Sequence, residues 1–507
     1  MENTKQIHSF MVGPARSEQL SALMRIVNAG RWFFCRIEGR RGIGKMSLLS
    51  QLAKSEPAFC ERLIYLQVPD SDERDVATAF QRSLNECDHI LAKSLSAKVV
   101  NFPTMAQAIG ELCRAGLIVV IDEFQYFTRA ALRSFNSFLQ AEVDALRGAN
   151  VKQGGLFVLG SLHADMFLLL EDKGAPLYGR LTQRIKLDPW DFEDLLDVFR
   201  SQDVLAPSQW LTLWTFFEGA PKFYHDAFEQ DLYQVGPEMF SDELLTRMFL
   251  RSSSPLSEEA DTWFLRELRG RSLSLLTYLA EHPGCSNGEL LAGVGSPEDK
   301  TQVSAYLTKL VSNYEMISKL NPVFSDGKNR NARYYIADNF LQAWLTVAKP
   351  AREAARLKPV DKAIELARPR LMNVEGVAFE KLIRKLHQEC SRKGKGDFEL
   401  SSLQLGYWNR SKDPSRHVEI DLVALDEPNK RVRFGSCKRS ADAHTHQSLA
   451  GFKSHVAGFL ATQDHQHMKD WTQEMVLFSP TFTQGDRIHL QSKGFMARDL
   501  NDYAALF

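Results

Sequence analysis

Short apolar runs alternate with longer amphipathic segments through the first 190 residues of the chain. Apolar runs without alternating polar positions are typical of strands buried on both faces of a parallel sheet. Amphipathic segments between such runs are typical of helices that connect the strands. This order predicts an α/β fold for residues 1–190. The predicted strands are 32–39, 62–68, 117–124, 155–161 and 183–190.

A helical region follows at residues 191–260. Its aromatic residues recur at helix-like spacing, which favours a role in packing over a role in ligand binding. We therefore expect them to lie in a helical core. They are Trp210, Trp214, Phe216 and Phe217.

The pattern of residues 261–348 predicts a winged helix. Predicted helices at 270–281 and 299–313 flank the segment SNGELLAGV at 286–294. Residues 322–338 contain an Asp-Gly pair between two possible strands, which predicts a β-hairpin with its turn at that pair.

Residues 349–370 are basic and contain three prolines. This composition predicts a linker or a connecting helix. Its charge fits either a solvated helix face or a contact with DNA, and the sequence leaves both open. The α/β pattern returns in residues 371–507.

The composition is that of a globular protein, with 44% apolar and 25% charged residues among 507. The net charge of −1 excludes a polybasic nucleic-acid binder as a description of the whole chain. No stretch is long and apolar enough to span a membrane, and the N-terminus shows no secretory pattern. The seven cysteines form no C-x-x-C pair, so neither a disulfide framework nor a cysteine zinc site is predicted. We expect a cytoplasmic protein with no membrane partner.

The segment GRRGIGKMSLL at 39–49 follows the first predicted strand. It matches G-x-x-x-x-G-K, in which glycines let backbone N–H groups surround the phosphates of a nucleotide. The lysine of this pattern reaches the β- and γ-phosphates of ATP. The predicted ATP-binding residues are Gly39, Arg40, Arg41, Gly42, Ile43, Gly44, Lys45, Met46 and Ser47.

Met46 stands where this pattern has Ser or Thr. The usual hydroxyl binds the magnesium ion of ATP, and a thioether is a poor ligand for so hard a cation. Ser47 does not simply replace it, because successive helix residues point about 100° apart. The loop therefore predicts ATP binding and leaves hydrolysis open.

A second motif supports the first. LIVVIDEF at 117–124 is an apolar strand that ends in Asp122 and Glu123. Such a strand end is the usual place for an acidic magnesium partner and a catalytic base in P-loop ATPases. The two motifs together predict a nucleotide site with far more specificity than either alone.

These motifs resemble the archaeal-type ATPases, STAND-like members of the AAA+ group of P-loop NTPases. The resemblance spans about residues 10–348 and implies a P-loop NTPase parallel sheet over 1–190, a helical lid over 191–260 and a winged-helix domain over 261–348. Besides the loop, the segments that carry it are DEFQ (122–125), Gly160-Ser161, PLYGR (176–180), RIKLDPW (184–190), EGAPKFY (218–224) and RNARYYIADNFLQAW (330–344).

By position, the resemblance implies a role for four polar residues. Asp122 would bind magnesium, and Glu123 would orient the attacking water. Ser161 would sense the γ-phosphate. Arg180 would sense the γ-phosphate too, or act as a finger toward a neighbouring subunit. An ordinary surface ion pair is the alternative for Arg180.

Two stretches near the C-terminus, 417–426 and 430–440, predict a second hairpin. Glu419 and Asp421 share one face of its first strand, and Lys438 lies on its second strand. A predicted helix at 376–390 carries Glu380.

A helix carboxylate, a strand aspartate and a strand lysine resemble the PD-(D/E)XK nuclease fold. The resemblance implies a restriction-endonuclease-like α/β domain over 371–507, in which Glu380 and Asp421 bind magnesium and Lys438 helps to activate water. Similar domains occur at the C-terminus of archaeal-type ATPases, where GYWNR (406–410) has counterparts. Here Ser436 replaces the acidic residue of the motif, which leaves nuclease activity open, with Glu419 as a possible substitute ligand.

Two hypotheses of function follow. The first is a nucleotide-switched protein that acts on DNA through a nuclease-type domain, with ATP and Mg²⁺ as cofactors, in defence or mobile-element biology. The second is a catalytically degenerate, nucleotide-binding scaffold or regulator that binds DNA, a protein partner or further copies of itself. The candidate phosphate contacts of the predicted wing are Lys328, Arg330 and Arg333, although exposed hairpins commonly carry such charges.

Overall fold

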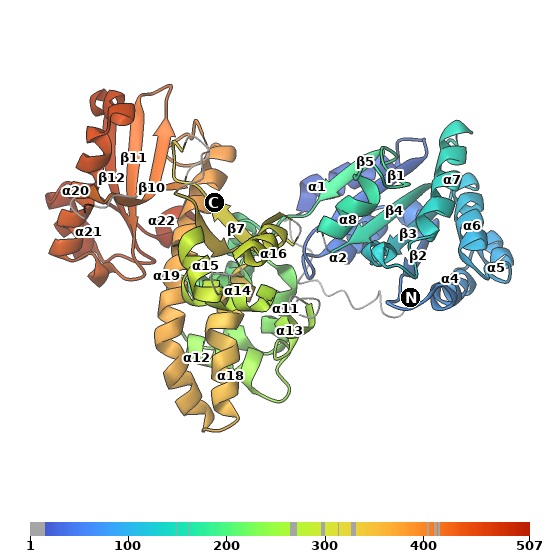
Figure 1. Cartoon of the computed structure of the whole chain (residues 1–507), viewed down its shortest axis with the longest axis horizontal. Coiled ribbons are helices and arrows are strands. Elements are labelled where there is room, and N and C mark those ends of the chain that lie inside the picture. The colour runs from blue at the N-terminus through green and yellow to red at the C-terminus, as the bar shows by residue number, and fades with distance from the viewer. Residues whose placement is uncertain are drawn as a thin grey trace. The chain divides into compact units, whose positions relative to one another are not determined.

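The computed structural model describes residues 16–149, 151–161, 163–263, 271–295, 300–312, 314–325, 331–402, 405–409, 413 and 416–507 (Figure 1). The chain divides into two compact units. The first comprises Met1–Pro189 with the short stretches Ala220–Lys222 and Ser312–Tyr314. The second comprises Trp190–Gly219, Phe223–Val311 and Glu315–Phe507.

The first unit is built on a five-stranded sheet with the strand order β2-β3-β4-β1-β5, and every neighbouring pair is parallel. Each strand lies within one of the five strands predicted from the sequence, so the predicted P-loop NTPase sheet is confirmed. The strands are β1 (Phe33–Glu38), β2 (Leu63–Gln67), β3 (Ile118–Asp122), β4 (Gly155–Gly160) and β5 (Gln183–Lys186).

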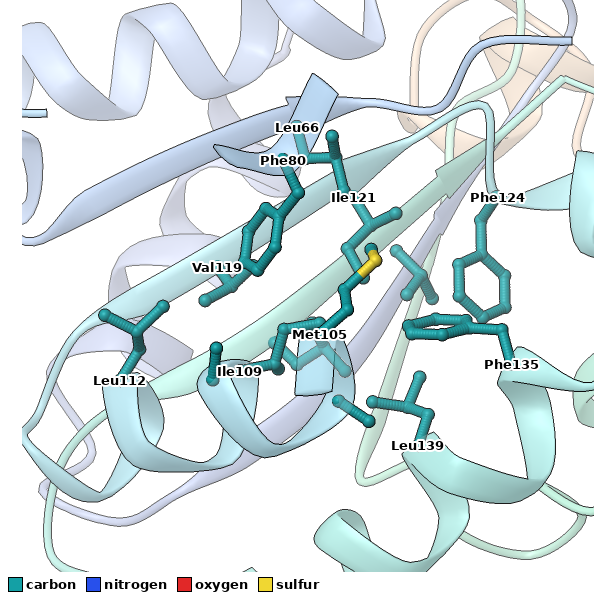
Figure 2. Packing of buried hydrophobic residues seen from close by; sticks show 14 of the residues in the cluster. Leu66, Phe80, Met105, Ile109, Leu112, Val119, Ile121, Phe124, Phe135 and Leu139 are labelled. Atoms are coloured by element: carbon teal, nitrogen blue, oxygen red, sulfur yellow. The ribbon is translucent and has the colours of Figure 1, made fainter. Parts of the chain in front are cut away.

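Helices cover both faces of this sheet. Because side chains at alternate strand positions point to opposite faces, each strand contributes to two separate cores. In β3, Val119 and Ile121 pack against α4 to α7, whereas Ile118 and Val120 pack against α1 to α3. Figure 2 shows the first of these cores, where Phe80 and Met105 meet Ile121. The helices are α1 (Ser17–Val27), α2 (Lys45–Ser55), α3 (Pro57–Cys60), α4 (Glu73–Glu86), α5 (Ile90–Ser96), α6 (Phe102–Arg114), η4 (Phe124–Thr128), α7 (Phe135–Gly148) and α8 (His163–Leu170).

The second unit begins with the predicted helical region. All four aromatic residues singled out there are at most 5% exposed, which confirms their packing role. The indole nitrogen of Trp214 donates to the carbonyl of Ala378, and the Thr212 hydroxyl donates to Glu375. The elements are α9 (Phe192–Ser201), α10 (Pro207–Phe217), α11 (Pro221–Glu229), η5 (Leu232–Gln234), α12 (Phe240–Leu245), η6 (Thr246–Leu250) and α13 (Glu259–Trp263).

Next along the chain are three helices and a small sheet of order β6-β8-β7. The predicted position of the hairpin is wrong in its first strand, because β7 precedes the segment 322–338 and only β8 lies within it. Pro322 lacks an N–H for a ladder, and its carbonyl accepts from Ser325 in a turn. The predicted Asp-Gly turn lies outside the described residues. The elements are α14 (Arg271–Glu281), β6 (Cys285–Ser286), α15 (Asn287–Val294), α16 (Lys300–Ser312), β7 (Ile317–Leu320) and β8 (Arg333–Ile336).

The basic segment 349–370 is helical and consists of α18 (Lys349–Ala355) and the first part of α19 (Val360–Arg392). Helix α19 has 33 residues and continues through Pro369. Of the two predicted forms, linker or connecting helix, the structure therefore shows the helix. Two short elements, α17 (Asn339–Ala343) and η8 (Trp344–Ala348), lead into it.

A second five-stranded sheet, of order β13-β12-β11-β10-β9, follows α19. Strands β10 and β11 form the antiparallel hairpin predicted from the sequence, whereas β11, β12 and β13 are parallel. Among the described residues, no helix is both long and apolar enough to cross a membrane. The elements are β9 (Leu405–Trp408), β10 (Glu419–Asp426), β11 (Arg431–Cys437), η10 (Ala441–Ala443), α20 (His446–Ala461), η11 (Gln463–Asp470), β12 (Thr472–Phe478), α21 (Gln484–Ser492), β13 (Met496–Arg498) and α22 (Leu500–Ala504).

Candidate functional site

The glycine-rich loop joins β1 to α2, and its shape requires glycine at two positions. Gly42 and Gly44 have φ angles of 76° and 92°, in the left-handed region that other residues avoid. A Cβ atom on Gly39 would come within 2.7 Å of the Leu187 carbonyl oxygen. The loop therefore closes tightly and leads directly into the N-terminus of α2, where unpaired N–H groups favour a bound anion.

Lys45 is the first residue of α2, and its side chain turns back into the loop. The Nζ atom donates to the carbonyls of Gly39 (2.8 Å) and Arg40 (3.2 Å) and to the Ser161 hydroxyl (2.9 Å). Burial lowers the pKa of Lys45 to about 8, an effect that the charges of Asp122 and Glu123 oppose. The structure thus brings Lys45 and Ser161 together, as a nucleotide site requires.

Asp122 is the last residue of β3 and is only 8% exposed. Its Oδ2 accepts from the Tyr65 hydroxyl at 2.9 Å, and its Oδ1 accepts from the backbone N–H of Glu123 at 2.8 Å. Burial and the negative charge of Asp122 raise the pKa of Tyr65, so the phenol keeps its proton and remains a donor. Sequence reasoning missed Tyr65, whose only signal is its position near the end of the strand that pairs with β3.

Glu123 adopts a left-handed conformation, with a φ angle of 56°, at the turn that follows β3. Its carboxylate accepts a hydrogen bond from the side-chain amide of Gln125, the last residue of the DEFQ motif. Glu123 is therefore fixed beside Asp122 by local hydrogen bonding.

Met46 offers no oxygen to the loop. Its side chain packs against the apolar core between the sheet and helices α1 to α3, the same core that Tyr65 contacts. Magnesium prefers six oxygen ligands in near-octahedral geometry, and the loop position that normally supplies one holds a thioether. The donor set of this loop therefore does not fit the usual magnesium site.

Arg180 lies against helix α7. Its guanidinium donates twice to the Asp144 carboxylate, at 2.7 Å for each bond. This is the surface ion pair that the sequence left as an alternative. A role for Arg180 as sensor or finger stays a prediction.

A second cluster gathers the three residues predicted for the nuclease-like centre: Glu380 from α19, Asp421 from β10 and Lys438 beyond β11. Burial raises the pKa of Glu380, and the charge of Asp421 raises it further, while Arg384 and Lys438 oppose the shift. Burial also raises the pKa of Asp421. The charge of Lys438 opposes the rise in the pKa of both carboxyl groups.

Hydrogen bonds orient this cluster. The backbone N–H of Cys437 donates to the Asp421 carboxylate at 2.8 Å. Arg384 donates to Glu380 at 3.1 Å and to the backbone carbonyl of Asp421 at 3.2 Å. Sequence reasoning missed Arg384, although its position four residues after Glu380 places it on the same helix face.

Glu419, the possible substitute for the acidic residue missing at Ser436, is engaged elsewhere. It accepts from Arg333 of β8 at 2.5 Å, and this pairing outweighs burial in setting its pKa below the usual range. Arg333 also lies over the Trp408 ring, 4.8 Å from its centroid. Lys328 and Arg330, the other wing cations, lie outside the described residues.

In the described part of the chain, no group of three or more His, Cys, Asp or Glu side chains is arranged to hold a metal ion. The predicted metal ligands Asp122, Glu380 and Asp421 thus form at most a pair. Their roles as ligands stay predictions.

Comparison with known proteins gives a partial family match. Residues 344–448 match the DUF234 family, described as archaea bacterial proteins of unknown function. The chain is 24% identical over 427 residues to the uncharacterized protein MJECL04 of Methanocaldococcus jannaschii, covering 83% of this chain and 86% of that protein.

Similar solved structures include the Walker-type ATPase PABY2304 of Pyrococcus abyssi, with 16% identity and a TM-score of 0.48 over 66% of this chain and 95% of that one. The ORC2 protein of Aeropyrum pernix has 15% identity and a TM-score of 0.46. This match covers 70% of this chain and 93% of that one.

Proposed function

We propose that the first unit binds a nucleoside triphosphate, ATP in the first instance, at the loop between β1 and α2. One observation carries this proposal: the buried Lys45 ammonium group lies at a helix N-terminus and donates its hydrogen bonds to three neutral oxygens. A buried cation is costly unless anions compensate it, and burial lowers the pKa of Lys45 despite the charges of Asp122 and Glu123. A phosphate in the loop would supply that anion and the acceptors.

The same geometry favours binding over rapid hydrolysis. Glu123 occupies the sequence position that the resemblance assigns to orienting the attacking water, but Met46 removes an oxygen ligand of magnesium. We therefore infer a nucleotide-held switch or scaffold, with ATP turnover slow or absent. This is the second of the two hypotheses stated from the sequence.

Equilibrium binding of a fluorescent ATP analogue to the full chain tests the proposal. Lys45→Ala should weaken binding by at least about 30-fold, because hydrogen bonds to charged groups contribute about 1.5–3 kcal/mol each. Lys54→Ala, in the last turn of the same helix, is the matched control and should bind as the wild type does. Equal binding by wild type and Lys45→Ala would refute a site at this loop.

For the C-terminal sheet we propose a PD-(D/E)XK-like domain that binds DNA phosphates. The support is the order of its elements, a helix, an antiparallel hairpin, a second helix and parallel strands, together with the cluster of Glu380, Asp421 and Lys438. Lys438 and Arg384 would hold the phosphate. Two carboxylates without the acid replaced by Ser436 are a poor set for magnesium, so we propose binding with little or no cleavage.

Binding to duplex DNA over a series of salt concentrations tests this second proposal. Contact with several phosphates predicts an affinity that falls steeply as salt increases. Lys438→Ala should make the slope shallower, whereas Lys430→Ala, on the turn between β10 and β11, serves as a control of equal charge. No measurable affinity at low salt would refute DNA binding by this domain and would favour a protein partner or self-association.

A further inference from the structure

We propose that the nucleotide site binds nucleoside triphosphate free of any divalent cation, with Arg40, Arg41, Lys45 and Lys222 supplying the positive charge. This inference deepens the proposed function and rests on it. Most P-loop proteins bind nucleotide together with magnesium. Three features of this loop argue for a different arrangement.

The first feature is the state of Asp122, the residue expected to approach the metal. Each of its carboxylate oxygens accepts a hydrogen bond, from the Tyr65 hydroxyl at 2.9 Å and from the Glu123 N–H at 2.8 Å. Because Asp122 is 8% exposed, water cannot easily replace a bond that is lost. A cation at this carboxylate would have to share oxygens that each already accept a hydrogen bond.

The second feature is Met46. The position that should offer a hydroxyl to the metal holds a thioether, which packs into the same apolar core as the Tyr65 ring. The Tyr65 hydroxyl donates its hydrogen bond to Asp122, so it offers the site a donor. Neither the packing of Met46 nor the hydrogen bond from Tyr65 to Asp122 supplies the oxygen ligand that the usual hydroxyl provides.

The third feature is the positive charge around the loop. Arg40 and Arg41 lie within it, and Lys45 fills it. Lys222 approaches from the EGAPKFY segment: its backbone N–H donates to the Gly42 carbonyl at 3.1 Å, and a Cβ atom on Gly42 would lie 3.1 Å from the Lys222 Cβ. Arginine binds phosphate through paired N–H donors and keeps its charge at any ordinary pH. These four cations outnumber the two nearby carboxylates of Asp122 and Glu123, so the loop keeps a net positive charge for a triphosphate.

Affinity for a fluorescent ATP analogue, measured on the full chain in EDTA and in Mg²⁺ at equal ionic strength, tests the inference. We expect the two dissociation constants to agree within about threefold. Binding at least about tenfold weaker in EDTA would overturn it. Absence of binding in both conditions would instead refute the nucleotide site itself, so the two failures are distinguishable.

A double variant, Met46→Thr with Tyr65→Phe, tests the structural cause. It restores the loop hydroxyl and releases one oxygen of Asp122, so Mg²⁺ should now tighten binding at least about tenfold. Tyr178→Phe, which removes a phenol from an exposed position of the same unit, is the control and should stay indifferent to Mg²⁺. If Mg²⁺ does not change the ATP affinity of the folded double variant, Met46 and Tyr65 do not set the metal requirement.

A second measurement follows the thermal unfolding midpoint. ATP in EDTA should raise the thermal unfolding midpoint of the first unit in the wild-type chain, since a ligand that binds only the folded state stabilises it. Arg41→Ala should reduce that rise. A rise that requires Mg²⁺ would contradict the inference.

Discussion

The two candidate centres differ in how each accommodates a missing oxygen ligand. At the loop of the first unit, Met46 packs into the core and Tyr65 satisfies the neighbouring carboxylate. At the C-terminal sheet, Ser436 leaves two carboxyl groups, Glu380 and Asp421, whose pKa values are raised. At the first centre, core packing and a hydrogen bond occupy the groups around the missing ligand. At the second centre, nearby cations do not fully offset the cost of burying the two acids.

This difference has a physical consequence. At the loop the charge of Lys45 is only partly compensated by Asp122 and Glu123, so the loop favours a bound anion. At the C-terminal cluster, Glu380 and Asp421 repel each other when both are charged. A bound proton, a metal cation or a nearby lysine lowers this repulsion. We therefore expect the loop to be difficult to return to metal dependence, and the cluster to be easier.

Restoring one acid at the C-terminal cluster should have the largest effect. In Ser436→Asp the new carboxylate adds a third oxygen ligand to Glu380 and Asp421, and three carboxylates hold a divalent cation far better than two. We expect Mn²⁺ to raise the unfolding midpoint of this variant, and plasmid nicking to increase at least about tenfold over the wild type.

Ser436→Asn is the matched control for that variant, because it has nearly the same shape and no charge. It should show neither the Mn²⁺-dependent stabilisation nor the nicking. Nicking by both variants at equal rates would mean that the side chain at position 436 acts by shape and not as a ligand. Nicking by neither, with Mn²⁺ binding unchanged, would show that the cluster does not bind cations.

A pH series should show the second largest effect, this time at the loop. Lys45 has a pKa lowered to about 8 by burial in the nucleotide-free protein, and bound phosphate would raise it. Below pH 8 the lysine is already charged, so affinity should be constant. Above pH 8 binding requires proton uptake, so affinity should fall by up to about tenfold per pH unit.

Equilibrium binding between pH 6.5 and 9.5 checks this expectation, with Lys45→Arg as the control. The arginine keeps its charge throughout this range, so its affinity, although weaker, should not change with pH. An identical fall in both proteins would assign the titration to another group.

The sequence predicted the elements of these centres better than their contacts. The strands of the first sheet were identified because residues such as Val119 and Val120 are buried on both faces, which leaves a continuous apolar run. The loop and the Asp122 motif were identified because phosphate binding restricts residue types over a short span. The sequence did not predict the role of Tyr65, because its hydrogen bond to Asp122 depends on which strand lies beside β3.

Long-range pairs were missed for the same reason. Arg333 and Glu419 are 86 residues apart, and neither has a local pattern that indicates the other. The hairpin around β8 was misplaced because the Asp-Gly pair is a strong local turn signal, although β7 lies further back in the chain. Local signals therefore predicted the type of element, while tertiary pairing determined its partners.

Removal of an acid from the C-terminal cluster should have a smaller effect, on stability. The raised pKa of Glu380 means that the folded state binds its proton more tightly than the unfolded state does. The resulting stabilisation is complete below the unfolded pKa near 4.5 and is lost as pH rises through the higher folded value. Glu380→Gln should therefore be more stable than the wild type near pH 8, by about 1 kcal/mol, and not at pH 4.

Denaturant unfolding at both pH values measures this change. Glu389→Gln, on the same helix, is an instructive control, because Glu389 is 3% exposed and fully paired with Lys393 and the N–H groups of Phe192 and Glu193. Its loss should destabilise the protein at neutral pH. A destabilised Glu380→Gln would mean that its bond to Arg384 outweighs the cost of burial.

The smallest effect concerns the wing cation that the sequence offered as a DNA contact. Arg333 pairs with Glu419 across a partly exposed interface, so the pair should contribute only about 0.5 kcal/mol. A double-mutant cycle of Arg333→Gln and Glu419→Gln, read by unfolding free energy, should give a coupling of that size. The same variants should bind duplex DNA as the wild type does, because Arg333 is held by Glu419 and Trp408. A loss of DNA affinity in Arg333→Gln with no coupling to Glu419 would instead make β8 part of the DNA-binding surface. The C-terminal cluster would then not be the main phosphate contact.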